Sequence, residues 1–336
     1  MIQAEAGNRL TDIPGLKVGQ AQDNHLKTGV TVVVGEAPMS AGISVLGGAP
    51  GTRDTQLLRQ GNSIERVDAI CLSGGSAFGL DASGGVLTAL ADMGRGIDVR
   101  GHKVPIVPGA IIFDLASGGA PRHGFAAHRD LAHQATHNAS ADFELGSVGA
   151  GTGALAGWLK GGVGTASSVI DGVTISALIV VNAVGAATIG DGAHFWAAPF
   201  EKAAEFGGLG IPQPWPTDAT DLRIKFDDGG VEGMNTTIGV IATDAALTAS
   251  QCERLAMAAQ DGLARAIWPC HTPADGDCIF SLATGNGPHA DPKAFFRLCT
   301  EASAVAARAV ASGVFHAINL HDDPYPSWQS RFGDKS

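Results

Sequence analysis

The stretch GMNTTIGV, residues 233–240, decides how this chain is interpreted. A loop rich in Gly and Asp runs there into a short apolar segment whose first two residues, Thr236 and Thr237, carry hydroxyl groups. By itself the pattern is ordinary, because Thr is common in strands and Asn is common in the turn before one. The same pattern also places a hydroxyl directly after a peptide carbonyl. The rest of the sequence decides between a simple turn and a reactive bond.

A chemical interpretation of this stretch is self-cleavage. The hydroxyl of Thr236 attacks the carbonyl carbon of Asn235, and hydrolysis of the resulting ester frees the α-amine of Thr236. An α-amine has a pKa of about 8, so at neutral pH it can accept the hydroxyl proton. Nucleophile and base then belong to one residue. The stretch therefore predicts a cut between Asn235 and Thr236, with Thr236 as the catalytic nucleophile.

Two carboxylates flank a glycine at Asp275-Gly276-Asp277, just before the apolar run 279–282. The simpler alternative is a solvated turn or a cap at the start of a strand. In the functional alternative, one carboxylate orients the terminal ammonium and the hydroxyl, as the third group of a catalytic triad orients the base. The other carboxylate then binds the ammonium of a substrate. A calcium loop is disfavoured, because only two acidic ligands are spaced correctly and no bidentate Glu follows at the required distance.

Asn182 interrupts the most apolar run of the chain, residues 178–185. A buried amide needs hydrogen-bond partners, so Asn182 serves either as a structural bridge at a strand end or as a donor to an oxyanion. A donor of the second kind can lower a barrier by about 3 kcal/mol. The sequence leaves both alternatives open.

A glycine-rich stretch at 146–153 resembles a dinucleotide-binding loop. However, Ala154 occupies the position of the third glycine of that motif, and no apolar strand precedes the stretch. We interpret the stretch as a backbone-lined pocket wall in which Gly149 and Gly151 face the substrate. Lys160 follows it and is expected to face inward. A solvated surface lysine is the alternative.

The composition indicates a large core and disfavours several classes of partner. Of the 336 residues 45% are hydrophobic and 16% charged, which is enough apolar material for one large core or two fused ones. The net charge of −11 disfavours nucleic-acid binding. The longest apolar stretch, 175–189, is too short to span a bilayer, and residues 1–15 lack the pattern of a signal peptide. We therefore expect a cytoplasmic protein with neither nucleic-acid nor membrane partners.

Other chemistries find little support in the residue patterns. The five cysteines include no CxxC pair, which fits reduced thiols better than disulfides or a zinc site. The eleven histidines show no paired ligand spacing, so we expect no metal and no cofactor. Residues 74–79, GGSAFG, fail the nucleophile elbow of serine hydrolases because Phe78 occupies its last glycine position.

Short apolar runs bounded by Gly, Pro or Asp predict strands, and periodic segments predict helices. The strands are expected at 30–34, 43–46, 69–72, 111–113, 176–181, 236–242 and 279–282, and the helices at 76–91, 124–137, 250–267 and 292–315. Ser250 and Glu253 form a capping box that is expected to open the third helix. The Pro-rich segment 211–228 is predicted to be an exposed linker. The mixture lacks strict βαβ alternation, which favours a layered α+β sandwich.

Several of these motifs occur together in one known family. The chain resembles the L-aminopeptidase/D-esterase family of self-cleaving N-terminal-nucleophile hydrolases, which includes the β-peptidyl aminopeptidases and the nylon-oligomer (6-aminohexanoate oligomer) endo-hydrolases. The resemblance spans nearly the whole chain and rests on separate motifs in the same order. These are LTDIPGLKVG at 10–19, LSGGSAFGLD at 72–81, GAGTG at 149–153, KGG at 160–162, NTT at 235–237 and DGD at 275–277, followed by the Ala-rich helix.

The resemblance implies a four-layer αββα sandwich formed by a single domain, 1–336. Self-cleavage would divide it into an α part, 1–235, and a β part, 236–336, which stay together in a homo-oligomer, as a tetramer of αβ units. The resemblance also implies site residues: Thr236 matches the nucleophile, Lys160 and Asn182 match residues that contact the nucleophile and the oxyanion, and Asp275 and Asp277 match the acidic pair of the nylon hydrolases. Phe78 departs from the pattern, since it stands where those hydrolases have a Tyr whose hydroxyl lines the site.

The function that follows is a self-processing amidohydrolase that removes N-terminal residues from peptides or cleaves short amides through an acyl-Thr236 intermediate. A 6-aminohexanoate oligomer endo-hydrolase is the first alternative. An acyltransferase related to ornithine acetyltransferases is a second, and a binding protein that has lost catalysis is a third.

Overall fold

The computed structural model describes residues 7–120, 126–225 and 235–333. Its strands are β1 (Leu16–Asp23), β2 (Thr28–Val45), β3 (Thr52–Arg53), β4 (Arg66–Ser73), β5 (Ile97–Val99), β6 (His102–Val104), β7 (Gly109–Ile111), β8 (Leu155–Ala156), β9 (Leu159–Lys160), β10 (Gly162–Ile170), β11 (Val173–Val181), β12 (Ile238–Thr243) and β13 (Cys278–Ala283). The α-helices are α1 (Ala82–Asp92), α2 (Ala126–His137), α3 (Ala249–Ala266), α4 (Pro292–Phe315) and α5 (Trp328–Phe332). Short 3-10 helices are η1 (Leu10–Asp12), η2 (Thr55–Leu58), η3 (Ser76–Asp81), η4 (Gly149–Gly151) and η5 (Ala198–Phe200).

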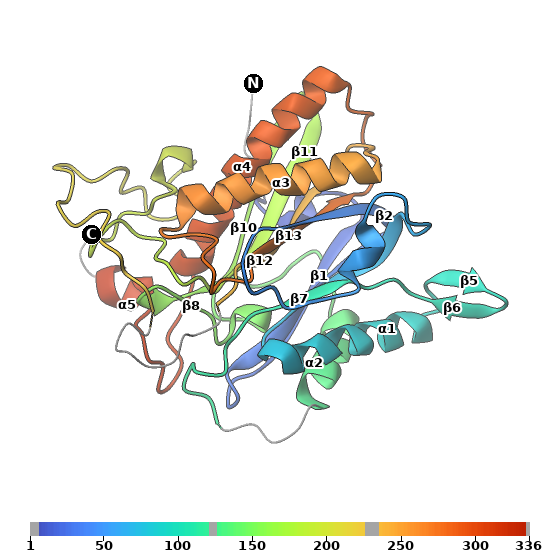
Figure 1. Cartoon of the computed structure of the whole chain (residues 1–336), viewed down its shortest axis with the longest axis horizontal. Helices are drawn as coiled ribbons and strands as arrows, with labels where there is room; N and C mark the ends of the chain where they lie inside the picture. Colours follow the sequence, from blue (N-terminus) through green and yellow to red (C-terminus); the bar gives the residue numbers. More distant parts are fainter. Residues whose placement is uncertain (1–6, 121–125, 226–234, 334–336) are drawn as a thin grey trace.

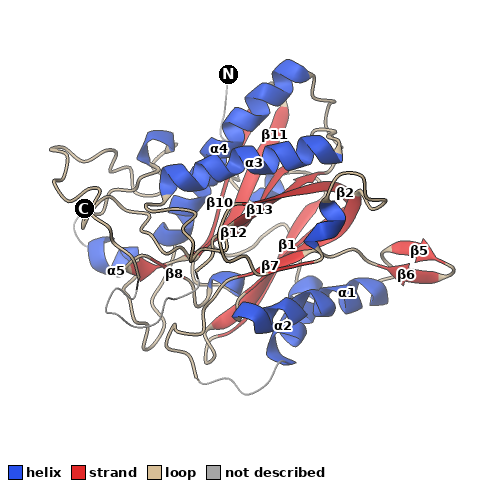
Figure 2. Ribbon diagram, in the orientation of Figure 1, coloured by secondary structure: helices blue, strands red, loops and turns tan. Residues whose placement is uncertain are grey.

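One long strand, β2, joins two halves of a mixed sheet. The strand order is β10-β11-β12-β13-β2-β4-β7-β3, and β1 also pairs with β2. The first half of β2 pairs with β1 and its last residues, 40–45, pair with β13. Between these halves the register with β4 shifts between Val34 and Met39. A bulge of this kind bends a strand, so a single hydrogen-bonded sheet can supply two stacked layers (Figure 2).

Three hydrophobic clusters show how those layers stack. Alternate residues of β11 point to opposite faces: Ile175 and Ile179 pack in a cluster with α3 and α4, whereas Leu178 packs in an inner cluster. The inner cluster also contains Ile70 of β4, from the other half of the sheet. A third cluster places the reverse face of β2, including Val32, against α1 and α2.

The fold is therefore a four-layer αββα sandwich, with α3 and α4 on one outer face and α1 and α2 on the other (Figure 1). Helix α4 has the length and composition of a membrane span, but 72% of its most apolar window is buried inside the protein. It packs on α3, β10 and β11. The β5–β6 hairpin projects away from the layers.

Several sequence expectations need correction. Strand β12 begins at Ile238, so Thr236 and Thr237 precede the strand instead of opening it. The capping box of α3 is formed by Thr248 and Gln251, whose side chain and backbone bond reciprocally; Ser250 and Glu253 are already helical. The expected helix 76–91 divides into η3 and α1. Residues 124–125 of the expected helix 124–137 lie outside the described residues.

Candidate active site

Parallel pairing of β12 with β13 brings the Asn-Thr bond beside the acidic pair. Ile238 lies opposite Cys278, and the residues before each strand continue the pairing as a bridge between Asn235 and Asp275. The backbone N–H of Asn235 donates to the carbonyl of Ala274 at 2.9 Å. Two segments about 40 residues apart in the sequence thus meet at the start of neighbouring strands.

Thr236 is buried, with 3% of its surface exposed. Its Oγ1 donates to the carbonyl oxygen of Asn235, and its backbone N–H donates to the carbonyl oxygen of Asn182 at 3.0 Å. The same Asn235 carbonyl accepts the backbone N–H of Gly276 at 2.7 Å. The carbonyl before the hydroxyl is therefore held and polarised by a backbone donor.

Gly276 has no room for a side chain. A Cβ atom at this position would lie 2.7 Å from Thr236 Oγ1 and 2.6 Å from the carbonyl oxygen of Ala49, both closer than real Cβ contacts. The glycine between the two carboxylates therefore lets its backbone approach the hydroxyl and the Asn235 carbonyl.

Asp277 divides its two carboxylate oxygens between different partners. Oδ1 accepts the backbone N–H of Thr237 at 2.7 Å. Oδ2 lies 2.8 Å from Nδ1 of His271 and 3.8 Å from the thiol sulfur of Cys270. Burial lowers the pKa of His271, but the hydrogen bond and the charge of Asp277 outweigh it and raise that pKa above its ordinary value. Burial, together with the Asp277 and Asp275 charges, raises the pKa of the Cys270 thiol.

Asp275 is held by neutral donors. Its Oδ1 accepts the backbone N–H of Val184 at 3.1 Å, and its Oδ2 accepts the N–H and the hydroxyl of Thr272 at 3.0 and 2.6 Å. Burial and the neighbouring charge of Asp277 raise the pKa of Asp275. Among the hydrogen bonds of the described residues, neither carboxylate bonds to Thr236 itself; Asp277 reaches its neighbour Thr237 instead.

Asn182 follows β11 and contacts the nucleophile through its main chain. Besides accepting from Thr236, it is fixed by its side chain: Oδ1 accepts the N–H of Leu155 at 3.0 Å, and Nδ2 donates to the carbonyl of Phe113 at 3.1 Å. The side chain therefore has the partners of a structural bridge, while the residue lies in direct contact with Thr236.

Lys225 is a buried residue of this site that sequence reasoning missed. Its Nζ donates to Oδ1 and to the carbonyl of Asn182 at 3.0 and 3.3 Å, and to the carbonyl of Leu155 at 3.0 Å. Burial lowers the pKa of Lys225 to about 7, against the opposing charges of Asp275 and Asp114. It lies in the segment 211–228 expected to be an exposed linker, of which 226–228 fall outside the described residues. No local sequence signal marks it.

Lys160 is buried, as expected of an inward-facing residue, and the alternative of a solvated lysine is wrong. Its Nζ forms an ion pair with Asp323 at 3.2 Å and donates to the carbonyl of Thr152 at 3.1 Å. The other oxygen of Asp323 binds Nζ of Lys27 at 2.9 Å. Burial lowers the pKa of Lys160 although Asp323 opposes the shift. Within the described residues, no hydrogen bond or ion pair joins Lys160 to Thr236.

The residues predicted to bind substrate lie in two short helices. Phe78 is in η3 and is 41% exposed. Gly149 and Gly151 are buried in η4. A Cβ added at Gly149 would lie 2.4 Å from Thr31 Oγ1, and one added at Gly151 would lie 2.6 Å from the backbone N of Val163. These two glycines thus allow η4 to pack closely on β2 and β10. Their role in substrate binding stays a prediction.

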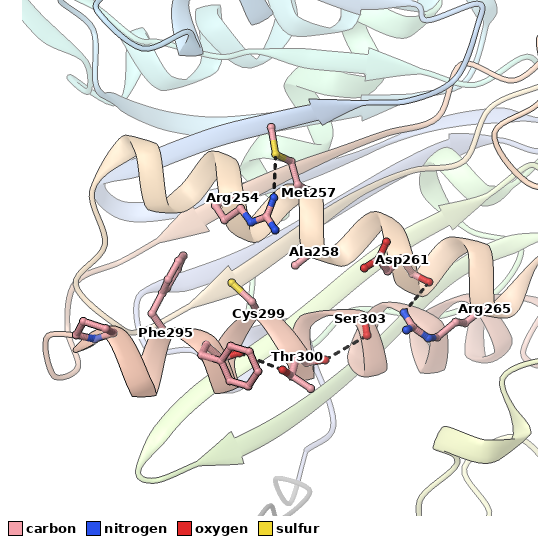
Figure 3. A pocket seen from close by; sticks show the side chains of 11 residues that line it. Arg254, Met257, Ala258, Asp261, Arg265, Phe295, Cys299, Thr300 and Ser303 are labelled. Carbon is pink, nitrogen blue, oxygen red and sulfur yellow. Dashed lines mark hydrogen bonds between the residues drawn. The ribbon is translucent and has the colours of Figure 1, made fainter.

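A groove of about 650 Å³ between α3 and α4 is lined by none of the site residues above (Figure 3). Its polar groups bond mainly within their own helix: Arg265 donates to the carbonyl of Asp261, and Thr300 to that of Phe296. We therefore place the candidate active site at Thr236 and not in this groove.

Solved structures show the same fold. A β-aminopeptidase of Burkholderia sp. superposes with a TM-score of 0.70 at 22% identity, covering 99% of this chain and 94% of that one. The L-aminopeptidase D-Ala-esterase/amidase of Ochrobactrum anthropi, described as a variant of the Ntn-hydrolase fold, gives a TM-score of 0.70 at 19% identity, with 99% and 96% covered. The sandwich is thus an Ntn-hydrolase fold of this variant.

Sequence comparison gives the family. Residues 8–323 match peptidase family S58, and the chain belongs to that family. An uncharacterized aminopeptidase of Mycobacterium tuberculosis is 43% identical over 330 residues, 92% of this chain and 94% of its own length. A 6-aminohexanoate-oligomer endohydrolase of Agromyces sp. is 28% identical over 282 residues, 81% and 74% of the two chains. The protein is therefore a peptide-bond hydrolase, as the sequence motifs predicted.

Proposed function

We propose that this hydrolase is a self-processing aminopeptidase that cuts its own chain between Asn235 and Thr236 and then uses Thr236 to release N-terminal residues from peptides or short amides. One observation carries the proposal: Thr236 Oγ1 and the Gly276 N–H both bond to the Asn235 carbonyl. A hydroxyl and an oxyanion donor therefore meet at a single peptide bond.

Self-cleavage begins with attack of Thr236 Oγ1 on the carbonyl carbon of Asn235. The Gly276 N–H stabilises the negative charge that develops on the carbonyl oxygen. The C–N bond then breaks, the hydroxyl proton ends on the departing amine, and an ester links the two residues. Water hydrolyses the ester, which leaves a carboxylate on Asn235 and a free α-amine on Thr236.

Turnover reuses the same positions. The new α-amine lies where the Thr236 backbone nitrogen donates to Asn182, and it accepts the hydroxyl proton as Oγ1 attacks the substrate carbonyl. A substrate carbonyl that takes the place of the Asn235 carbonyl meets the Gly276 N–H. The leaving amine takes the proton, and water then releases the acyl group from Thr236.

Neighbouring residues hold this geometry. The ammonium of Lys225 and the backbone N–H of Leu155 both donate to Oδ1 of Asn182, which fixes the orientation of the side-chain amide. Nδ2 therefore points away from these two donors. The Nδ2 group has a second N–H besides the one donated to Phe113, and this second N–H is the predicted oxyanion donor. Asp277 holds Thr237 by its backbone and so positions Thr236 beside it.

Relatives favour an aminopeptidase over a nylon-oligomer hydrolase. The 43% identical mycobacterial proteins are named aminopeptidases, whereas the endohydrolases are 28% identical. The buried carboxylates of Asp275 and Asp277 suit any substrate with a free ammonium group, so they do not separate the two activities. Phe78 lacks the hydroxyl that a Tyr would supply at its position.

The homo-oligomer of αβ units and the cytoplasmic location stay predictions.

Mass spectrometry of the purified protein tests the proposal. We expect two fragments, the second beginning at Thr236, in place of the 34.0 kDa chain. Thr236→Ala should leave the chain intact and abolish hydrolysis of aminoacyl amides, because both steps need the hydroxyl. Thr236→Ser retains a hydroxyl and is the matched control, which should still be cut. A Thr236→Ala protein that is cut and active would place the nucleophile elsewhere.

A further inference from the structure

A cluster of three chemically different ligands lies behind the candidate active site. Cys270 and His271 belong to the loop between α3 and β13, and both face the same carboxylate oxygen of Asp277. Their ligand atoms and that oxygen all lie within 4.8 Å of one another. The sequence shows no CxxC or paired-His spacing here, so the cluster was not expected from ligand motifs.

We propose that Cys270, His271 and Asp277 form a binding site for a zinc ion, and that an ion bound there inhibits the hydrolase. Sulfur, imidazole nitrogen and carboxylate oxygen are the three kinds of ligand that zinc accepts together, whereas calcium and magnesium require oxygen. Three protein ligands leave the fourth tetrahedral position for water or a small molecule.

The distances fit such an ion. Zinc binds these ligands at about 2.0–2.3 Å, so that neighbouring ligand atoms in a tetrahedron lie about 3.4 Å apart. Asp277 Oδ2 lies 2.8 Å from His271 Nδ1 and 3.8 Å from Cys270 Sγ, values on either side of that separation. An ion would take the place of the imidazole proton that bridges His271 and Asp277.

Backbone geometry and exposure also fit. His271 has φ of +55°, a left-handed conformation that is uncommon in residues other than glycine and is found often in functional loops. This conformation accompanies the approach of both its backbone N–H and its ring to Oδ2 of Asp277. The side chain of His271 is 17% exposed and that of Asp277 is 2% exposed, so His271 is the more accessible of these two ligands.

Inhibition follows from the way Asp277 divides its oxygens. Oδ1 holds the backbone of Thr237, next to the nucleophile, while Oδ2 faces the proposed ion. An ion on Oδ2 withdraws negative charge from this carboxylate and so weakens its hydrogen bond to the backbone of Thr237, next to the nucleophile. Inhibition rests on the proposed function of Thr236, whereas zinc binding does not.

Calorimetric titration of the purified, self-processed protein with zinc chloride tests binding without reference to turnover. We expect one saturable site per chain. Cys270→Ser should lower zinc affinity at least about 10-fold, as loss of a ligand or its support does. Cys299→Ser, which alters another partly exposed thiol, is the matched control and should bind zinc as the unmodified protein does.

Cobalt supplies a second measurement that needs no variant, since a thiolate bound to cobalt gives a charge-transfer absorption. We expect this absorption on titrating the unmodified protein with cobalt chloride, and zinc should displace it. Turnover of an aminoacyl amide should fall with zinc occupancy in the unmodified protein and be restored by a chelator. The proposal is overturned by the absence of saturable zinc uptake or cobalt–thiolate absorption, by equal zinc affinity in Cys270→Ser, or by full turnover at saturating zinc.

Discussion

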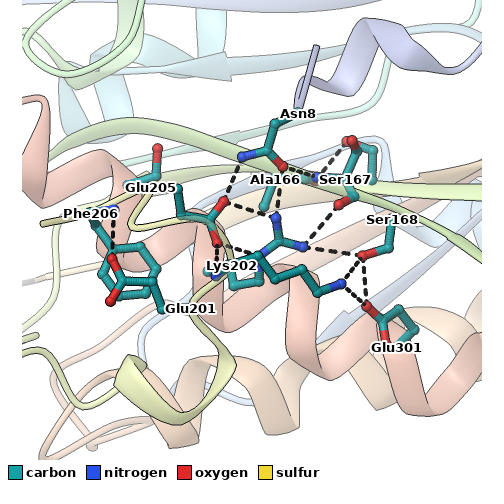
Figure 4. Close-up of polar contacts among 12 residues, drawn as sticks. Asn8, Ala166, Ser167, Ser168, Glu201, Lys202, Glu205, Phe206 and Glu301 are labelled. Carbon is teal, nitrogen blue, oxygen red and sulfur yellow. Dashed lines mark hydrogen bonds and ion pairs between the residues drawn. The ribbon is translucent and has the colours of Figure 1, made fainter. Parts of the chain in front are cut away.

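Two clusters of buried charged side chains in this molecule are built in opposite ways. Around Arg308 of α4, opposite charges are in contact: the guanidinium donates to both oxygens of Glu205, to Asn8 Oδ1 at 2.8 Å and to the hydroxyl of Ser168 at 3.1 Å (Figure 4). Glu301 bonds to the same hydroxyl and to Lys202. Charges and donors are matched within the cluster.

Around Thr236, Asp275 and Lys225 are kept out of contact with opposite charges. The hydrogen bonds described for Asp275 come from neutral N–H and O–H groups, and those of Lys225 go to neutral oxygens. The pKa of Asp275 is accordingly raised and that of Lys225 lowered, each chiefly by burial. Perturbed groups of this kind collect at functional sites more often than in stabilising networks. The contrast therefore separates a cluster with matched charges from the candidate active site, where Asp275 and Lys225 lack an opposite charge in contact.

Removing the cation of the first cluster should have the largest effect on stability. Arg308→Met leaves the largely buried carboxylate of Glu205 without its charged partner, and we expect the free energy of unfolding to fall by about 3–5 kcal/mol. Urea unfolding in a Thr236→Ala background, where every chain is expected to stay intact, measures the change.

The control for Arg308→Met is the same substitution on the same helix. Arg297 pairs with Asp171 where both side chains are about half exposed, so Arg297→Met should cost no more than about 1 kcal/mol. When Thr236 is left intact, turnover per folded molecule should be retained in Arg308→Met. Equal stability of the two variants would show that the Arg308 cluster does not support the fold.

A methyl group at Gly276 should disturb the second cluster with a smaller change in energy. The new carbon would press on Thr236 Oγ1 and the Ala49 carbonyl. We expect Gly276→Ala to slow self-cleavage and turnover by about 100-fold, since misplacement of a reacting group by about 1 Å has that effect. Time courses of chain cleavage on gels and steady-state rates measure it.

Gly84→Ala in α1 is the control for the methyl group, because its Cβ would meet nothing nearer than 3.4 Å. It should process and turn over normally. A Gly276→Ala enzyme with normal rates would mean that the close approach of this backbone to Thr236 is not needed.

The sequence predicted much of the fold because buried strands and helices leave local patterns. The expected helix 292–315 coincides with α4, and apolar runs marked β2, β4, β11, β12 and β13, whereas the strand expected at 111–113 shares only Ile111 with β7. Strand β10, GVGTASSVI, was missed because its small residues resemble a loop. Its glycines have a packing reason: a Cβ at Gly164 would lie 2.0 Å from the Ala309 carbonyl of α4.

Contacts between distant segments of the site were harder to predict. The meeting of Asn235 with Asp275 depends on the parallel pairing of β12 and β13, which no local pattern reveals. Lys160 was expected at the nucleophile, but its partner Asp323 lies 163 residues further along the chain. That pair, with Lys27, is built like the Arg308 cluster, with opposite charges in contact. Lys225 was missed because only folding shows that it is buried.

The pH dependence of stability tests whether burial of the Lys225 ammonium in the second cluster destabilises the folded protein. Its pKa is about 7 in the folded protein and 10.5 without perturbation, so between these values the unfolded chain binds a proton that the folded chain does not. Stability then rises with pH in this window, whereas below pH 7 both states are protonated and the cost of burying the charge is constant. Relative to Lys225→Met, the protein with the unmodified lysine should gain about 2 kcal/mol in its free energy of unfolding from pH 7 to 8.5.

Thermal unfolding of both proteins in the Thr236→Ala background measures this difference. Lys293→Met, at an exposed position, controls for the loss of one charge. A difference between the two proteins that stays constant with pH would show that Lys225 remains charged in the folded protein, and the contrast between the two clusters would then rest on Asp275 alone.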